Sequence, residues 1–152
     1  MTPKLAGNLL RSIGWGFIVF GVVFVTIAFV EYDGFAQTLT NVFDWTGGPH
    51  TEDLTRDARW FAAIMSGLSA GFGALYVFLV APLLSLPNST ARRLAKRGGL
   101  IAVVLWFVID NIGSLAAGVP SNVAMNTLFL IAIAGPLIMV KFPDELNVSR
   151  TT

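Results

Sequence analysis

The sequence predicts an all-α fold, a four-helix transmembrane bundle built as a single integral membrane domain over residues 1–152. Composition is the first reason: 55% of the residues are apolar and only 12% are charged, whereas a soluble domain carries about 25% charged residues. The second reason is a set of four long apolar stretches. The third is that lysine and arginine gather at alternate connections between these stretches.

Each apolar stretch is long enough to cross the hydrocarbon core, which takes roughly 20 residues. The expected spans are residues 12–30, 60–86, 98–119 and 122–140. They should be helices, because lipid offers no partner for free backbone groups. The first stretch is expected to be a retained helix. Its apolar core exceeds the roughly 7–15 residues of a signal peptide, and no small-residue cleavage site follows it.

The first connection, residues 31–59, lies between the first two spans and is rich in acidic residues. Phe35, Leu39, Val42 and Phe43 recur near helical spacing, which predicts a short amphipathic helix on the outer membrane surface. The alternative is that this segment is a lid over a site between the helices. His50 stands near two acidic residues, but a solvated loop is the favoured interpretation and no metal site is expected.

The distribution of basic residues predicts the orientation in the membrane. Lys4 and Arg11 precede the first span, and a second group of basic residues follows the second span. Both groups, and the C-terminal tail, fall on one side if there are four spans. Because cytoplasmic loops carry the excess of lysine and arginine, both termini are expected in the cytoplasm of a bacterial cell, with the protein in the inner membrane.

The basic group between the second and third spans has a second expected use. Its members can attract anionic lipid headgroups, at about 1 kcal/mol per charge. The residues are Arg92, Arg93, Lys96 and Arg97.

Small residues predict where helices pack closely, because small side chains let backbones approach in lipid. Gly67 and Gly71 form one small-xxx-small pair in the second span, and Ser66 belongs to a second row of small residues. Gly14 and Gly21 in the first span can receive such a face. Packing within the chain is favoured over the alternatives, a cavity or a homodimer interface. Pro82 and Pro136 are expected to kink the second and fourth spans.

One carboxylate interrupts the third span. Asp110 lies about 13 Å before the expected helix end at residue 119, at roughly 1.5 Å per residue, and so in the outer half of the membrane. An ionisable residue at this depth is a functional hypothesis by default. Helical spacing puts Ser114 on the same face, whereas Asn111 is one step round and is expected to face another helix.

The turn at residues 118–121 makes the third and fourth spans antiparallel neighbours. It brings Asn122 and Asn126, four residues apart on one face, toward Asp110. Arg59 at the start of the second span is the expected counter-ion of Asp110. We therefore predict an outer-leaflet polar cluster, which either clamps the helices together or has a function, as the lining of a pocket for a small polar or amphipathic ligand or as a proton path. Its predicted members are Arg59, Asp110, Asn111, Ser114, Asn122 and Asn126.

Composition also narrows the function classes. The chain has no cysteine and a single histidine, which argues against disulfides, thiolate chemistry and multi-histidine metal sites. No nucleophile–base set or phosphate-binding glycine loop is found, so no cofactor and no catalytic residues are assigned. Nucleic-acid binding is not expected.

The layout resembles the small four-helix bacterial membrane proteins of the DoxX-like group over roughly residues 34–140. The resemblance rests on "RDARWFAAIMSGLSAGFGALY", a basic inner connection, and "DNIGSLAAGVPSN". It implies an accessory role near membrane redox complexes. The expected function is a non-enzymatic accessory or scaffold subunit that contacts lipids and other subunits or its own copies. The alternative is a membrane protein that binds a small molecule, quinone or lipid at the polar cluster. A small membrane enzyme or transporter is the third class.

Overall fold

The computed structural model describes residues 1–49 and 51–142, and these residues form helices and connections without a strand. Four helices are long and apolar enough to cross a membrane. They are α1 (Pro3–Phe24) with a following 3₁₀ segment (Val25–Ala28), α3 (Arg56–Leu75) with its continuation through α4 (Ala81–Leu84), α5 (Ser89–Ala116) and α6 (Pro120–Met139). The predicted all-α architecture with four candidate spans is confirmed, and the chain is compatible with a multi-pass membrane protein.

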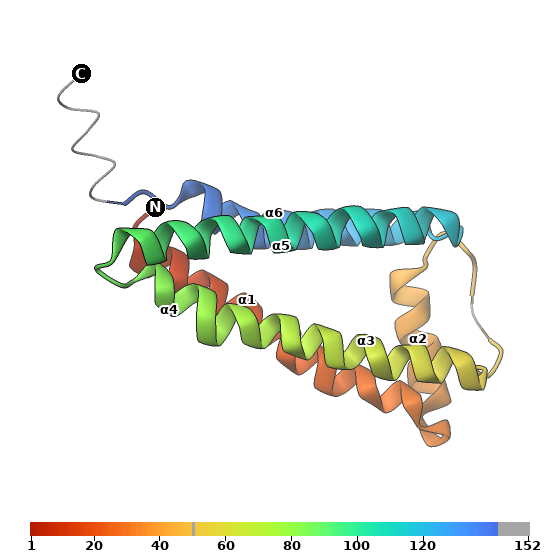
Figure 1. Ribbon diagram of the computed structural model, residues 1–152. Coiled ribbons are helices and arrows are strands. Elements are labelled where there is room, and N and C mark those ends of the chain that lie inside the picture. Colours follow the sequence, from red (N-terminus) through yellow and green to blue (C-terminus); the bar gives the residue numbers. More distant parts are fainter. Residues whose placement is uncertain (50, 143–152) are drawn as a thin grey trace.

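The four long helices form two antiparallel pairs, α1 with α3 and α5 with α6 (Figure 1). The pairs are joined at the end that holds the N-terminus, where the Met1 ammonium donates to the Met139 carbonyl and the Lys141 amide donates to the Met1 carbonyl. From this end the pairs diverge, so the bundle opens toward the opposite end (Figure 1). We call this open end the outer end, after the orientation expected from the basic residues.

On the side of the termini, α1 and α5 extend beyond the expected spans, by beginning at Pro3 and Ser89. α5 begins at Ser89, where the Asn88 side chain accepts a hydrogen bond from the Ala91 amide as an N-cap. The basic group that contains Arg92 and Lys96 therefore lies on the first turns of a 28-residue helix and not in a loop. Apolar composition marks only the lipid-facing part of a helix, whereas capping residues mark its end.

Close approach of backbones holds α1 against α3. A Cβ added to Gly14 would lie 2.7 Å from the Gly73 carbonyl oxygen, and one added to Gly21 would lie 2.5 Å from the Ser66 carbonyl oxygen. Gly67 and Gly71 are placed differently: they are exposed, and a Cβ at either would meet nothing within 4 Å. The row that faces α1 is thus the Ser66 row, while Gly67 and Gly71 lie on the outward face of α3.

A π-helical turn, Tyr76–Val80, separates α3 from α4. It stands just before Pro82, which has no amide hydrogen and whose ring would clash with the carbonyl of residue 78 in a regular helix. The wider turn relieves this conflict, and the Ala81 amide donates to the Tyr76 carbonyl. Tyr76 is buried in the main core, and its hydroxyl donates to the Gly99 carbonyl of α5 at 2.8 Å. This hydrogen bond therefore joins the two helix pairs in the half of the bundle that holds the N-terminus, which we call the closed end.

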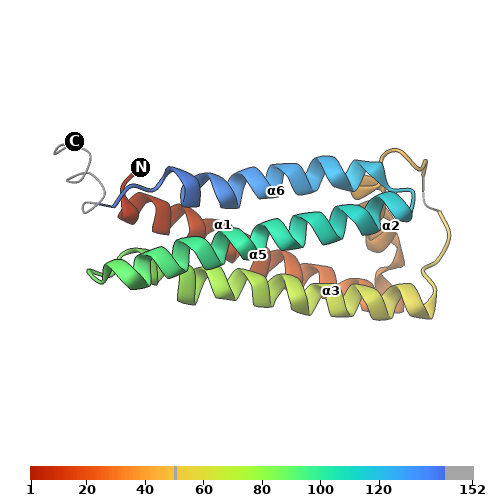
Figure 2. The ribbon, with the colours of Figure 1, turned by 45° about the horizontal axis from the view of Figure 1, so that its top comes forward.

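A short helix, α2 (Asp33–Phe43), lies across the opening between the pairs at the outer end (Figures 1 and 2). Its Ala36 packs with Ile27 and Ala62 in a small second core. The predicted short helix in the first connection therefore exists, and it bridges the two pairs, as the lid interpretation requires. Its placement on a membrane surface stays a prediction.

Candidate functional site

The polar cluster forms where α5 and α6 face each other, about 3–9 Å from the outer end of each helix at roughly 1.5 Å per residue. Asp110 Oδ2 accepts hydrogen bonds from Asn122 Nδ2 at 3.3 Å and from Asn126 Nδ2. Both amides come from one face of α6, four residues apart. The carboxylate on α5 is thus held by two donors from its neighbouring helix.

Two further residues complete the cluster. The Ser114 hydroxyl donates to the Asp110 carbonyl at 2.8 Å and accepts from Asn122 Nδ2 at 2.8 Å. Asn111 is only 8% exposed, and its Oδ1 accepts from Asn126 Nδ2 at 2.8 Å. Asn111 therefore faces α6 together with Asp110 and does not turn toward another helix. The structure brings together five of the six residues expected in the cluster.

The hydrogen bonds fix which atoms of the amides face the carboxylate. An ionised carboxylate only accepts hydrogen bonds, so the nitrogen of each asparagine must point toward Asp110. The Nδ2 groups of Asn122 and Asn126 are used within the cluster, whereas their Oδ1 atoms and Asp110 Oδ1 have no donor among the described residues. The cluster residues that border the cavity described next thus keep oxygen acceptors available.

An aromatic cavity of about 420 Å³ lies between the helix pairs, and three residues of the polar cluster, Asp110, Asn122 and Asn126, line one end of it. Its volume is in the range of small-molecule sites, roughly 300–1,000 Å³. Rings form most of the apolar wall, among them Phe17 and Phe129, whose centroids lie 5.3 Å apart. The described lining residues are Phe17, Phe20, Phe24, Thr40, Phe43, Asp44, Met65, Ser69, Trp106, Asp110, Val119, Asn122, Asn126 and Phe129.

The C-terminal end of α2 lies over part of the cavity and contacts the start of α6. Asp44 is buried, and its Oδ1 accepts from the Gly47 amide at 3.0 Å and from the Thr46 hydroxyl at 3.1 Å. The Ser121 hydroxyl of α6 donates to the same oxygen at 3.4 Å. Asp44 therefore positions α2 over the cavity, and Phe43 and Thr40 of α2 line it.

A second hollow, of about 400 Å³, borders the polar cluster from the outward side of α5. It shares Phe43, Asp110, Val119 and Asn122 with the aromatic cavity. The polar cluster thus stands between the cavity and the surface of the bundle, with Phe43 of α2 at the boundary.

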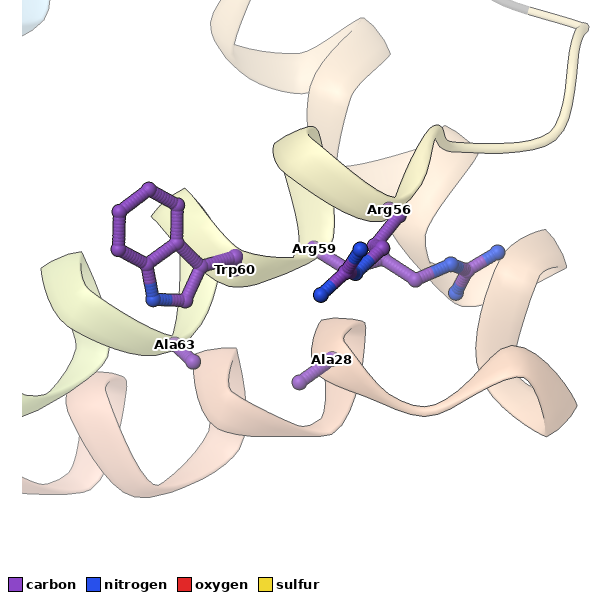
Figure 3. Close-up of a pocket in the computed structure, with 5 residues that line it drawn as sticks. All are labelled: Ala28, Arg56, Arg59, Trp60 and Ala63. Carbon is purple, nitrogen blue, oxygen red and sulfur yellow. The ribbon is translucent and has the colours of Figure 1, made fainter.

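The position of Arg59 differs from the sequence prediction, which paired this residue with Asp110. Its guanidinium forms an ion pair with Asp33 at the start of α2 and donates to the Ile27 carbonyl. It lines a different hollow, of about 410 Å³, together with Arg56, Trp60, Ala63 and Ala28 (Figure 3). The expected Arg59–Asp110 pair is absent because α3 and α5 belong to pairs that diverge at this end, whereas α2 brings a nearer carboxylate.

The predicted lipid-binding residues lie at the closed end. Arg92 and Lys96 stack over the Phe142 ring at 5.1 and 5.8 Å from its centroid, and Lys96 Nζ donates to the Val140 carbonyl. Arg93 and Arg97 are exposed. Within the described residues no group of three or more potential metal ligands occurs. His50 lies outside the described residues.

The aromatic wall was not predicted, although the spacing of the aromatic residues in the sequence could have indicated it. Phe17, Phe20 and Phe24 recur at helical spacing on one face of α1. Trp106 precedes Asp110 by one turn, and Phe129 follows Asn126 by one turn, so polar and aromatic residues share the same faces of α5 and α6. Asp44 and Ser121 had no such signal, because their contact depends on how α2 crosses the bundle.

Comparison with known proteins adds no family assignment, since no family model, no curated protein and no solved structure matches the chain. The resemblance to the DoxX-like group stays a prediction from the layout of the sequence.

Proposed function

We propose that the protein binds an amphipathic small molecule between its helices, as a non-enzymatic multi-pass protein of the bacterial inner membrane. The observation that carries this proposal is the cavity of about 420 Å³, with Asp110, Asn122 and Asn126 at one end and aromatic rings over most of its apolar wall. Such a division suits a molecule with a polar head and an apolar body. This proposal reverses the order of the two functions expected from sequence.

Two features favour binding over a purely structural clamp. A clamp between helices would satisfy its own polar atoms, whereas the oxygens Asp110 Oδ1, Asn122 Oδ1 and Asn126 Oδ1 lack donors in the described part of the chain. The counter-ion that a clamp needs is also engaged elsewhere, because Arg59 pairs with Asp33. A ligand headgroup in the cavity would complete the hydrogen bonding of these oxygens.

Native mass spectrometry of the protein purified in mild detergent tests this function. The variant Ser69→Phe adds a ring at a half-buried position that lines the cavity, and Leu68→Phe adds one at the neighbouring exposed position. We expect a bound small molecule on the wild type and on Leu68→Phe but not on Ser69→Phe. Equal occupancy in all three proteins would contradict the proposal. So would a stoichiometric protein partner without any small molecule.

The outward face of α3 favours an accessory subunit as a second candidate function. Gly67 and Gly71 are exposed one turn apart, and small residues at this spacing allow another spanning helix to approach closely. This face would receive a partner subunit or a second copy of the chain. Loss of a co-purifying subunit in Gly67→Leu would support this role, and an unchanged subunit composition would contradict it.

A further inference from the structure

The hydrogen-bond pattern at the polar end of the cavity selects the chemistry of the headgroup. We infer that the ligand is a hydrophobic amine whose protonated ammonium group binds the free oxygens of Asp110, Asn122 and Asn126. The inference rests on the proposed function, because it names the class of molecule that the cavity takes. An ammonium group brings up to three donors and no acceptor, which matches a set of oxygen acceptors.

Charge leads to the same headgroup. Asp110 lies in the outer half of the bundle, where an uncompensated carboxylate is costly. None of the described residues that line the cavity is Lys, Arg or His, and the nearest candidate from the sequence, Arg59, is paired with Asp33. A cationic ligand would supply the missing counter-charge, and its hydrogen bond to the carboxylate would be of the strong, charge-assisted kind.

The aromatic wall favours the same class of ligand. Trp106 stands one helical turn from Asp110 on α5, and its ring centroid lies 6.4 Å from that of Phe129. Aromatic faces attract ammonium groups within about 6 Å, and tryptophan does so most strongly. The rings of α1 and the Met65 side chain then offer apolar surface to the body of the molecule.

The same pattern disfavours a quinone and an anionic lipid headgroup. A quinone carbonyl at the polar end would need a donor there, yet the amide nitrogens of Asn122 and Asn126 are already directed to Asp110, Ser114 and Asn111. A phosphate or carboxylate would meet the like charge of Asp110. The polar end thus discriminates between the ligand types that the sequence left open.

The test uses a series of molecules with one tail and different heads: decylammonium, decanol and decanoate. Trp106 reports binding directly when Trp15→Phe, Trp45→Phe and Trp60→Phe remove the other tryptophans of the chain. The protein is reconstituted in nanodiscs of phosphatidylglycerol, which has no amine, and Trp106 fluorescence is titrated. We expect decylammonium to bind at least about tenfold more tightly than decanol, as one charge-assisted hydrogen bond implies.

The variant Asp110→Asn removes the charge and retains an oxygen that can accept from the two asparagines. We expect it to bring the affinity for decylammonium down to that for decanol. Asp53→Asn removes the same charge from an exposed position outside the cavity lining and should leave the affinity difference intact. Thermal unfolding of each variant establishes that the fold is retained.

The possible results separate the two proposals. Saturable binding of decanol with no preference for decylammonium, or a preference that survives Asp110→Asn, would overturn the amine inference and leave the proposed function standing. No response to any of the three molecules would overturn both. Weaker decylammonium binding in phosphatidylethanolamine nanodiscs would support the inference with a lipid amine as the source. Unchanged binding there would support it with a free amine.

Discussion

The close approach of α1 and α3 makes Gly14→Ala a sharp test of the bundle that frames the cavity. A Cβ at this position would lie 2.7 Å from the Gly73 carbonyl oxygen and 2.8 Å from Val77 Cγ2. Both distances are shorter than side-chain carbons tolerate, and the first partner is backbone, which cannot rotate away. The two helices would have to separate by several tenths of an ångström where Gly14 contacts Gly73.

The expected magnitude follows from two opposing terms. Overpacking costs about 1–3 kcal/mol, whereas alanine is more favourable than glycine inside a helix by roughly 0.5–1 kcal/mol. Gly16, on the exposed side of α1, has nothing within 4 Å of an added Cβ and so experiences only the second term. Gly16→Ala should be neutral or stabilising, and Gly14→Ala should be less stable than Gly16→Ala by about 1–3 kcal/mol.

Reversible unfolding of both variants in mixed detergent micelles measures this difference directly. The comparison cancels the change in helix propensity, because both substitutions are Gly→Ala within the same helix. A Gly14→Ala protein as stable as Gly16→Ala would refute the packing described for α1 and α3.

Three other predictions address the cluster, α2 and the orientation. Asn126→Ala removes the two hydrogen bonds that its side chain donates to Asp110 and Asn111. Because an interhelical hydrogen bond in a membrane contributes roughly 0.6–1.7 kcal/mol, the free energy of unfolding should fall by about 1–3 kcal/mol. An unchanged unfolding curve would contradict the cluster. Arg59→Met leaves the Asp33 carboxylate of α2 without its partner. It should lower the free energy of unfolding by about 1–3 kcal/mol, a cost between those of losing an exposed and a buried ion pair. Partial recovery in Arg59→Lys is expected, and stability equal to wild type would argue against the pair. Because the chain has no cysteine, single cysteines introduced by Thr51→Cys and Thr90→Cys can be labelled in cells with a membrane-impermeant maleimide. We expect labelling only at residue 51. Labelling only at residue 90 would show the opposite orientation in the membrane.

Composition and spacing predicted the parts of this molecule that depend on local physics. Apolar run length identified the four long helices, and i, i+4 spacing placed Asn122 and Asn126 opposite Asp110. The short turn between α5 and α6 makes these helices antiparallel neighbours, so the contacts between Asp110 and the two asparagines can be predicted from sequence alone.

The remainder depends on long-range geometry that spacing does not encode. Arg59 has several carboxylates within reach along the chain, and only the position of α2 selects Asp33 over Asp110. In the same way, the choice between the Gly67 row and the Ser66 row depends on the rotation of α3 about its axis. The divergence of the two helix pairs, which creates the cavity, has no counterpart in the local sequence.

Photolabelling in the membrane tests the central claim most directly. A decylamine derivative that carries a diazirine in its tail would be activated in native membranes, and the labelled residues would be mapped by peptide sequencing. The cavity predicts labels on inward residues such as Phe17 and Phe129, reduced in Ser69→Phe and in excess unlabelled decylammonium. Labels confined to lipid-facing residues such as Val19 and Leu128, which are 59% and 62% exposed, would contradict a binding site between the helices.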